Sequence, residues 1–467
     1  MMDRRLSSVL FATLAASFCS WRGLASGDPK WSLPRTTEVF MSNELKALLV
    51  TKEDAPLVTV ILRIRQGSLS DPEGQEGLTE LGARLLARGT SSKDASAIAL
   101  AAERMGASIE ANSNHEHVEI SIDLLWNDLR AGLELLSELV RDSEFPEVEL
   151  ESVRTQMKAE LRAVQEEPDA VAIRRFRSVL YGGTGYGRPV LGSEASLDAL
   201  TRDRVAAHTR SLLDPSRAFL VVAGPLREHE TPFEYSKSAL GLVNASFQGW
   251  RSSSPAPELR HSPPRPGPMV VLVDRPDLTQ IDVVVGYAGL SRLDPERIPL
   301  RMASLILGGT SSSRLFHALR SEQGLSYDLS SSCSYRTHGG EVQIRGATRP
   351  GTAARLVEGI LAEVDRLTTE APSREEVDRA RSIYETELLA LTETGDDLAD
   401  LVADIEELGL PAALLEEAHA TLLATGKEKI VEIARKVLTP EHRVIVLVGP
   451  TAELDKEFEK WGKIVKE

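Results

Sequence analysis

The most informative stretch of this chain is residues 308–327, which read Gly308-Gly309-Thr310-Ser311-Ser312-Ser313-Arg314-Leu315-Phe316-His317-Ala318-Leu319-Arg320-Ser321-Glu322-Gln323-Gly324-Leu325-Ser326-Tyr327. An apolar run with helical spacing, Leu300 to Leu307, comes immediately before it. Two glycines and a group of small polar residues then interrupt the periodicity, as a loop or an N-cap cluster does. Helical spacing resumes at Leu315, Phe316 and Leu319. The stretch therefore predicts a helix, a loop and a second short helix.

The end of the second helix brings two hydrogen-bonding side chains near each other. Arg320 falls in the last turn, and Gly324 is a suitable terminator because glycine adopts a positive φ at little cost. The residues from Leu325 to Leu329 predict the start of a strand. Arg320 and Tyr327 can therefore face the same cleft. Spacing alone also allows Arg320 to be an ordinary solvated cation, whereas a phosphate-binding loop is disfavoured because no Gly-Lys-Ser/Thr follows the glycines.

The stretch resembles the C-terminal half of peptidase family M16, the insulinase and mitochondrial-processing-peptidase family. There it reads roughly Gly-Gly-x-x-Ser-Ser-Arg-Leu-Phe-x-x-Leu-Arg-x-x-x-Gly-Leu-x-Tyr, so the match is dense. The resemblance implies that Arg320 and Tyr327 correspond to the family's Arg/Tyr pair, which contacts substrate beside a zinc site. It also marks Gly308, Gly309 and Ser312 as substrate-binding positions. It extends over nearly the whole chain, roughly residues 37 to 455.

The composition is that of a soluble globular protein, and it argues against some classes of partner. The chain has 467 residues, enough for two or three domains with a large core, and 42% of them are hydrophobic. The formal net charge is −16 and there is no basic cluster, which disfavours nucleic acid or an anionic membrane as a partner. After the N-terminal segment, no run is long and apolar enough to predict a transmembrane helix.

The N-terminus has the pattern of a targeting segment. Arg4 and Arg5 precede an apolar and small-residue run, Leu6 to Phe18, that is short for a membrane span. Leu24-Ala25-Ser26-Gly27 then offers small residues for cleavage. Residues 1–26 are accordingly predicted to be a signal peptide, and the protein is expected to be periplasmic or secreted.

The chain repeats itself at a nearly constant interval. Two Pro-containing pairs recur after 225 residues and one Gly-Thr pair recurs after 220 residues. The duplication predicts an α+β fold of two homologous halves, each a largely antiparallel sheet packed with helices, which can enclose a cavity between them. The recurring pairs are Asp214-Pro215 with Thr439-Pro440, Gly224-Pro225 with Gly449-Pro450, and Gly89-Thr90 with Gly309-Thr310.

Domain boundaries follow from this repeat. Residues 37–227 are predicted to form the first half and residues 269–455 the second half. Between them, residues 228–268 are predicted to be a linker, because Ser, Pro and charged residues dominate from Ser252 to Pro268.

A histidine pair lies inside a predicted strand of the first half. Residues from Ser108 to Leu124 alternate between polar and apolar and predict one strand. His115-Glu116-His117 lies within it, and the two histidines would share one face. That arrangement would allow a metal pair, although a polar strand face is the favoured interpretation.

The family's zinc motif, His-x-x-Glu-His, is missing from its expected place. In that motif two histidines one helical turn apart bind zinc and the Glu activates the bound water. Aligned on the preceding Gly-Leu and the following Gly-Thr, the corresponding positions are Glu80, Ala83 and Arg84. Both histidines and the catalytic Glu are therefore absent, and Arg84 places a cation where the metal would be. The sequence predicts a chain that binds no zinc of its own.

The family's third zinc ligand is a Glu about one helix later, and Met157-Lys158-Ala159-Glu160-Leu161 matches that position. A single carboxylate does not hold zinc. Glu160 would then be a remnant of the ligand set or, as the favoured interpretation, a solvated helix residue.

The resemblance implies a function in proteolysis that depends on a second chain. Some members of the family work as two-chain complexes, in which one chain carries zinc and the other carries Arg and Tyr. This chain is expected to be the second kind, inactive alone, with zinc in a homologous heterodimer partner. Arg320 and Tyr327 would bind the substrate carbonyl or the oxyanion during cleavage of peptides or small unfolded proteins.

Two other interpretations remain beside this one. The alternative is a non-catalytic scaffold or peptide-binding interaction protein of the same fold. A self-sufficient zinc peptidase would need ligands that the sequence lacks.

Overall fold

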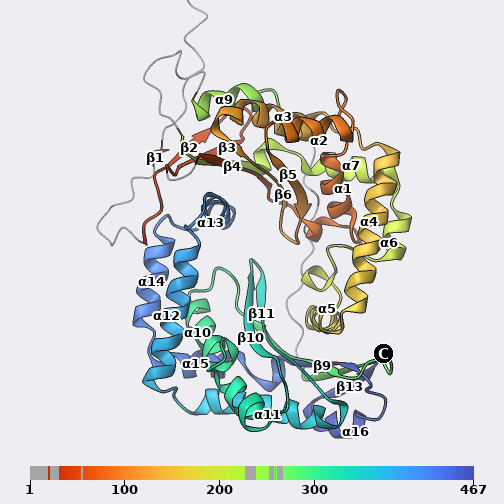
Figure 1. The fold of residues 1–467 in the computed structure, drawn as a ribbon, viewed down its shortest axis with the longest axis vertical. Helices are drawn as coiled ribbons and strands as arrows, with labels where there is room; N and C mark the ends of the chain where they lie inside the picture. Colours follow the sequence, from red (N-terminus) through yellow and green to blue (C-terminus); the bar gives the residue numbers. More distant parts are fainter. Residues whose placement is uncertain are drawn as a thin grey trace, which may run out of the picture.

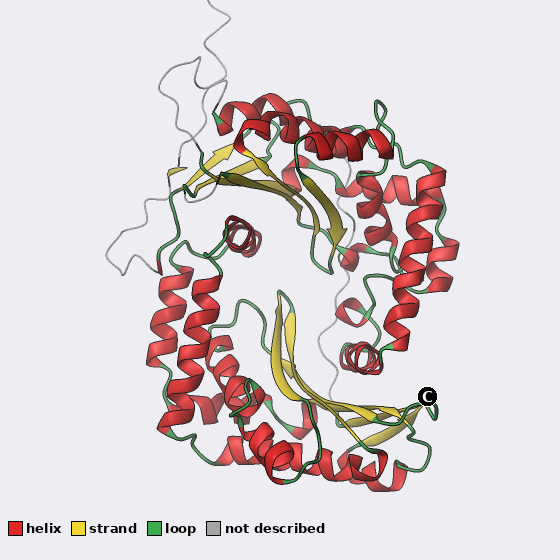
Figure 2. Ribbon diagram, viewed as in Figure 1, coloured by secondary structure: helices red, strands yellow, loops and turns green. Residues whose placement is uncertain are grey.

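The computed structural model of the chain describes residues 19–20, 31–53, 56–226, 238–251, 257, 259 and 267–467. These residues form two halves, each a sheet with helices packed on it (Figures 1 and 2). Most of the predicted signal peptide lies outside the described residues, and only Cys19–Ser20 (β1) is described, paired antiparallel with β2. Among the described residues, no helix combines the length and the apolar character needed to cross a bilayer.

The sheet of the first half has seven strands in the order β1-β2-β3-β7-β4-β6-β5. The pair β3 and β7 is parallel, and the other neighbours are antiparallel. The strands after β1 are β2 (Thr36–Phe40), β3 (Lys46–Thr51), β4 (Leu57–Ile64), β5 (Ser108–Ser113), β6 (Val118–Leu125) and β7 (Ala218–Gly224).

The sheet of the second half has six strands in the order β10-β11-β9-β12-β8-β13. Strand β8 is parallel to both β12 and β13, and the other pairs are antiparallel. The run β8-β12-β9-β11-β10 repeats the run β3-β7-β4-β6-β5 strand for strand, which confirms the predicted duplication and fold class. The strands are β8 (Met269–Asp274), β9 (Ile281–Gly289), β10 (Leu329–Arg336), β11 (Gly339–Thr348), β12 (Arg443–Gly449) and β13 (Lys463–Lys466).

Most helices pack on the outer side of the sheet of their own half (Figure 1). The helices of the first half are α1 (Leu78–Leu86), α2 (Ala95–Arg104), α3 (Leu129–Arg141), α4 (Glu147–Glu166), α5 (Pro168–Leu180), α6 (Glu194–Ala199), α7 (Arg202–Leu212) and α9 (Ala239–Phe247). The helices of the second half are α10 (Arg297–Gly308), α11 (Ala353–Thr369), α12 (Arg374–Ala390), α13 (Gly395–Leu408), α14 (Leu414–Ala424), α15 (Lys427–Val437) and α16 (Asp455–Phe458).

Two helices cross over and cover the sheet of the other half. Helix α13 lies against the inner face of the first sheet, and α5 lies against the second sheet (Figure 1). From α13, the buried side chains are Leu398, Ala399, Val402 and Ala403, and from the first sheet they are Leu48, Val50, Ile61, Phe219, Val221 and Ala223. From α5, they are Ala172, Phe176 and Leu180, packed on Val271, Val284, Val444, Val446 and Val448.

The approach of α5 to the second sheet depends on one glycine. A Cβ added at Gly286 of β9 would lie 2.2 Å from the ring of Phe176. The ring of Phe176 is itself fully buried. Gly286 therefore gives α5 the space to lie directly on the strands.

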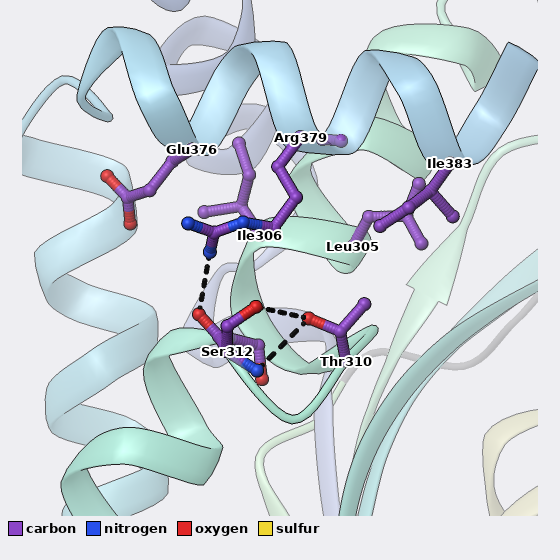
Figure 3. A pocket seen from close by; sticks show the side chains of 9 residues that line it. Leu305, Ile306, Thr310, Ser312, Glu376, Arg379 and Ile383 are labelled. Atoms are coloured by element: carbon purple, nitrogen blue, oxygen red, sulfur yellow. Dashed lines mark hydrogen bonds between the residues drawn. The ribbon is translucent and has the colours of Figure 1, made fainter.

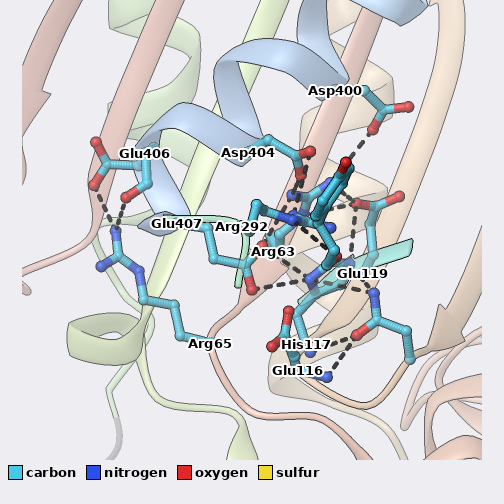
Figure 4. A network of polar contacts seen from close by, with 12 residues as sticks. Arg63, Arg65, Glu116, His117, Glu119, Arg292, Asp400, Asp404, Glu406 and Glu407 are labelled. Atoms are coloured by element: carbon cyan, nitrogen blue, oxygen red, sulfur yellow. Dashed lines mark hydrogen bonds and ion pairs between the residues drawn. The ribbon is translucent and has the colours of Figure 1, made fainter. Parts of the chain in front are cut away.

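A polar network fixes α13 to the first sheet (Figure 4). The guanidinium of Arg63 on β4 donates to Glu119 at 2.6 Å, to Asp404 at 2.8 Å and to Glu407 at 3.1 Å. Arg63 is only 3% exposed. Carboxylates from both halves neutralise its buried charge. Arg65 of the first half forms a further ion pair with Glu406 of α13.

The predicted strand from Ser108 to Leu124 is two strands, β5 and β6, and His115 and His117 lie in the turn between them. The prediction that the two histidines share a strand face was therefore wrong. His115 contacts the carbonyl of Arg188 at 3.0 Å and Nη1 of Arg336, which ends β10, at 3.2 Å. Burial and the neighbouring Arg336 charge lower the pKa of His115 to about 4. The six consecutive polar residues from Asn112 to His117 interrupt the alternation, and they were a usable signal for this turn.

Two further stretches differ from the sequence-based expectation. The strand expected from Leu325 begins only at Leu329. The predicted linker, residues 228–268, contains α9, whose Val243 and Phe247 belong to the core of the first half. Residues 227–237 and most of 252–266 lie outside the described part of the chain.

We expect Phe176→Ala to lower the free energy of unfolding by about 3–5 kcal/mol, because it removes a fully buried ring and leaves a cavity between α5 and the second sheet. Urea denaturation measures the loss, and hydrogen exchange should show faster exchange in β9 and β12. Phe40→Ala is the matched control, since Phe40 is 52% exposed, and it should cost about 1 kcal/mol or less. Equal losses in the two variants would contradict the packing role of α5.

A second expectation concerns pH. His115 is neutral in the folded protein down to about pH 4, whereas in the unfolded chain it protonates near 6.5. The unfolded state therefore binds more protons in this window, and stability falls as the pH drops from about 6.5 to about 4, by up to about 3 kcal/mol for this group.

The His115→Gln variant cannot take up that proton, so its stability should vary less with pH than that of the wild type over this window. The comparison is made by urea denaturation at a series of pH values. His317→Gln removes an exposed histidine and serves as control. Identical pH profiles for His115→Gln and the wild type would refute the assignment.

Candidate functional site

Helix α1 carries the three positions that correspond to the zinc motif. It begins after Gly77, which has a φ of +92°. The carboxylate of Asp71 accepts hydrogen bonds from the backbone N–H of Gly77 at 3.2 Å and of Thr79 at 3.0 Å, so it caps the helix start. Glu80 and Arg84 are four residues apart and therefore lie on the same side of α1.

The guanidinium of Arg84 bridges two carboxylates from different helices. Its Nε donates to Glu80 Oε1 at 2.6 Å, and its two terminal nitrogens donate to the two oxygens of Glu160 on α4 at 2.7 and 2.9 Å. The other oxygen of Glu80 accepts from the N–H and hydroxyl of Ser113 at 2.6 and 2.9 Å. Burial alone would lower the pKa of Arg84, but its hydrogen bonds and charge contacts with Glu160 and Glu80 outweigh it and raise the pKa above its usual value.

These residues do not fit a zinc ion. Ala83 has no donor atom, and the N–H groups of Arg84 already engage both carboxylates. Across the part of the chain that the structure describes, no group of three or more His, Cys, Asp or Glu side chains is arranged to hold a metal. Glu160, favoured from the sequence as a solvated helix residue, is exposed on α4, and it also forms a two-pronged ion pair with Arg84.

The second site lies on a short π-helix, Phe316–Glu322, and on the loop that follows it. Gly324 ends this helix with a φ of +60°, as predicted. The N–H of Gly324 donates to the carbonyl of Arg320, and the N–H of Leu325 donates to that of Leu319. Leu319 is buried against Gly359 of α11, where an added Cβ would lie 2.3 Å from its side chain. The π-helix is thus held closely on α11.

The structure brings Arg320 and Tyr327 together. The guanidinium carbon of Arg320 lies 4.1 Å from the centre of the Tyr327 ring and 4.4 Å from the centre of the Phe316 ring. Tyr327 is 80% exposed. Within the described ranges, no carboxylate lies within ion-pair distance of Arg320. The pair is therefore open to an external acceptor.

The other motif positions lie in or beside the loop between α10 and the π-helix (Figure 3). Gly308 is buried, and an added Cβ would lie 2.6 Å from the backbone nitrogen of Ser331 on β10, so this glycine permits close packing of α10 on the strand. Gly309 caps α10 and is exposed. The carbonyl of Ser312, an exposed residue, accepts a hydrogen bond from Arg379 of α12 at 2.9 Å. These contacts fix the loop, and a substrate role for the three residues stays a prediction.

Sequence reasoning missed two parts of these sites. One is the bridge between Arg84 and Glu160, which are 76 residues apart. The i,i+4 spacing of Glu80 and Arg84 was a usable signal for its helical part. The other is Phe316, whose ring centre lies 4.4 Å from the guanidinium carbon of Arg320. Its i,i+4 spacing from Arg320 was likewise visible in the sequence.

Two family models match the chain. The model described as insulinase (peptidase family M16) covers residues 46–194, and the model described as peptidase M16 inactive domain covers residues 199–384. The chain is 23% identical to the uncharacterized zinc protease YmxG of Bacillus subtilis over 417 residues. That alignment covers 88% of this chain and 98% of YmxG. The chain is 23% identical over 433 residues to the mitochondrial-processing peptidase subunit beta of Bos taurus, with 91% and 86% covered.

Solved structures of the same fold are also similar. A protease from Helicobacter pylori superposes with a TM-score of 0.81 at 19% identity and covers 90% of this chain and 100% of its own. A structure titled peptidase M16 inactive domain, from Pseudomonas fluorescens, gives a TM-score of 0.79 at 20% identity over 89% of this chain and 98% of that one. Matches to both halves and the shared two-sheet architecture lead to one conclusion: the chain belongs to peptidase family M16.

Proposed function

We propose that this chain is an M16 peptidase subunit that binds no catalytic zinc and lends Arg320 and Tyr327 to a zinc-bearing homologue in a heterodimer. The observation that carries the proposal is the Arg84 bridge. The positively charged guanidinium of Arg84 is hydrogen-bonded to Glu80 and to Glu160, so these two carboxylates are not available to bind a metal ion. The exposed Arg320 and Tyr327 pair supports the second part of the proposal.

The chemistry assigned to this chain is hydrogen-bond donation to the substrate. Arg320 offers N–H groups with a full positive charge, and Tyr327 offers a hydroxyl on an exposed ring. Zinc in the partner would supply the activated water. The two donors of this chain would hold the carbonyl oxygen of the scissile peptide bond and stabilise the negative charge that develops on it.

The substrates proposed are peptides or small unfolded proteins, because an unstructured backbone can present its carbonyl groups to such donors. The targeting pattern at Arg4, Arg5 and the apolar run after them supports a periplasmic or secreted location. A scaffold or peptide-binding role of the same fold is the outcome that the experiments below distinguish from catalysis.

The purified chain should hold no stoichiometric zinc after dialysis, because Arg84 occupies the carboxylates of Glu80 and Glu160 and the motif positions on α1 contain no histidine. Metal analysis by mass spectrometry measures this. A variant with Glu80→His, Ala83→Glu and Arg84→His rebuilds the motif on α1 with Glu160 as third ligand, and it serves as the positive control. One tightly held zinc per wild-type chain would overturn the proposal.

Arg320→Ala and Tyr327→Phe should each lower kcat/KM of the reconstituted pair by about ten- to a thousand-fold, because each removes one donor to a developing oxyanion. Since both donors act on one oxygen, the double variant should lose less than the product of the two single effects. Steady-state cleavage of an unstructured peptide measures the rates.

Size-exclusion chromatography checks that assembly is intact in these variants, and Arg162→Ala, which removes an exposed arginine on α4, is the control. Full cleavage activity in the Arg320→Ala, Tyr327→Phe double variant would end the catalytic role and leave the scaffold.

A further inference from the structure

The guanidinium of Arg320 lies over the rings of two aromatic residues. Phe316, one helical turn earlier, is 4.4 Å from it, and Tyr327, beyond the turn at Gly324, is 4.1 Å from it. A guanidinium is planar and is attracted to the faces of aromatic rings. The proposed function gives Phe316 no role.

The contacts with the two rings leave the hydrogen-bonding capacity of the guanidinium available. They are made through the ring faces, which hold no oxygen or nitrogen acceptor, so they do not occupy the N–H groups as a carboxylate would. In the described part of the chain, Arg320 forms no ion pair, and its side chain has no hydrogen-bond partner. The rings therefore restrict where the cation lies while its donors stay free.

Of the two aromatic residues, Phe316 is the one whose chain neighbours are fixed by contacts with other helices. Two residues before it, buried Arg314 forms a two-pronged ion pair with Glu376 of α12 at 2.6 and 3.2 Å. Arg379, also on α12, holds the preceding loop through the Ser312 carbonyl (Figure 3). Three residues after it, Leu319 is buried on α11. Tyr327, in contrast, is 80% exposed in a loop.

We propose that Phe316 is a positioning residue for Arg320. Its ring, fixed to α11 and α12 through the π-helix, holds the guanidinium face so that the free N–H edge and the Tyr327 hydroxyl are presented together. A flexible arginine loses rotamer freedom when it binds an acceptor, and a ring that already restricts it reduces that loss. The catalytic consequence rests on the proposed function, whereas the stacking itself does not.

The stacking is tested on the chain alone. In protein with isotope-labelled arginine, ring currents should displace the NMR signal of the Arg320 Nε–H group, assigned through the Arg320→Lys variant. Phe316→Leu removes the ring but keeps an apolar side chain, and it should return the signal toward the value of a solvated arginine. Phe316→Tyr should preserve the displacement. Phe40→Leu makes the same change at an exposed phenylalanine on β2 and should leave the signal unchanged.

The positioning role is tested on the reconstituted pair. Phe316→Leu should lower kcat about ten-fold with little change in KM, since the restriction matters most when charge develops on the substrate oxygen. Phe316→Tyr should restore most of the rate. Phe316→Leu with an unchanged signal would refute the stacking, and a changed signal with an unchanged rate would refute the positioning role.

The two proposals fail in different ways. If Arg320→Ala and Tyr327→Phe leave cleavage unaffected, the proposed function fails, and the NMR signal still decides the stacking. If those variants impair cleavage while Phe316→Leu does not, the proposed function stands and the positioning role of Phe316 is wrong.

Discussion

The exchange of α5 and α13 between the two halves is the constraint on which the rest of the structure depends. Strands β3, β7 and β4 carry apolar side chains on both faces, and α13 covers the face that the helices of their own half leave open. Helix α5 does the same for β8, β9 and β12. Because a strand that is apolar on both faces needs cover on both, neither half buries its sheet alone. The duplicated chain is therefore one packing unit.

Charged side chains at the same interface define how the halves meet. Arg63 is almost fully buried, and its carboxylate partners come from β6 of its own half and from α13 of the other. A buried ion pair contributes little net stability compared with apolar packing, but loss of one partner leaves a costly unpaired charge. The apolar contacts thus supply the binding energy, and the Arg63 network disfavours other placements of α13. The hydrogen-bond contact between His115 and Arg336 also links the two halves.

The arginines of the two motif regions, Arg84 and Arg320, have different surroundings. Arg84 is neutralised by Glu80 and Glu160, so its side chain joins α1 to α4. Arg320 has aromatic neighbours in place of carboxylates, so its charge remains available to a ligand. One arginine therefore links two helices through ion pairs, while the other contacts aromatic rings and has no ion-pair partner among the described residues.

The sequence by itself determined the features that depend on local pattern. The recurring Gly-Pro and Gly-Thr pairs revealed the duplication, and Gly324 marked the helix end where a positive φ was needed. The absence of histidines at positions 80 and 84 was also readable directly. Only the tertiary structure decided which sheet α5 and α13 cover and that Glu160 meets Arg84. Periodicity identifies which face of an element is apolar or polar, but it carries no information about which distant surface comes to cover that face.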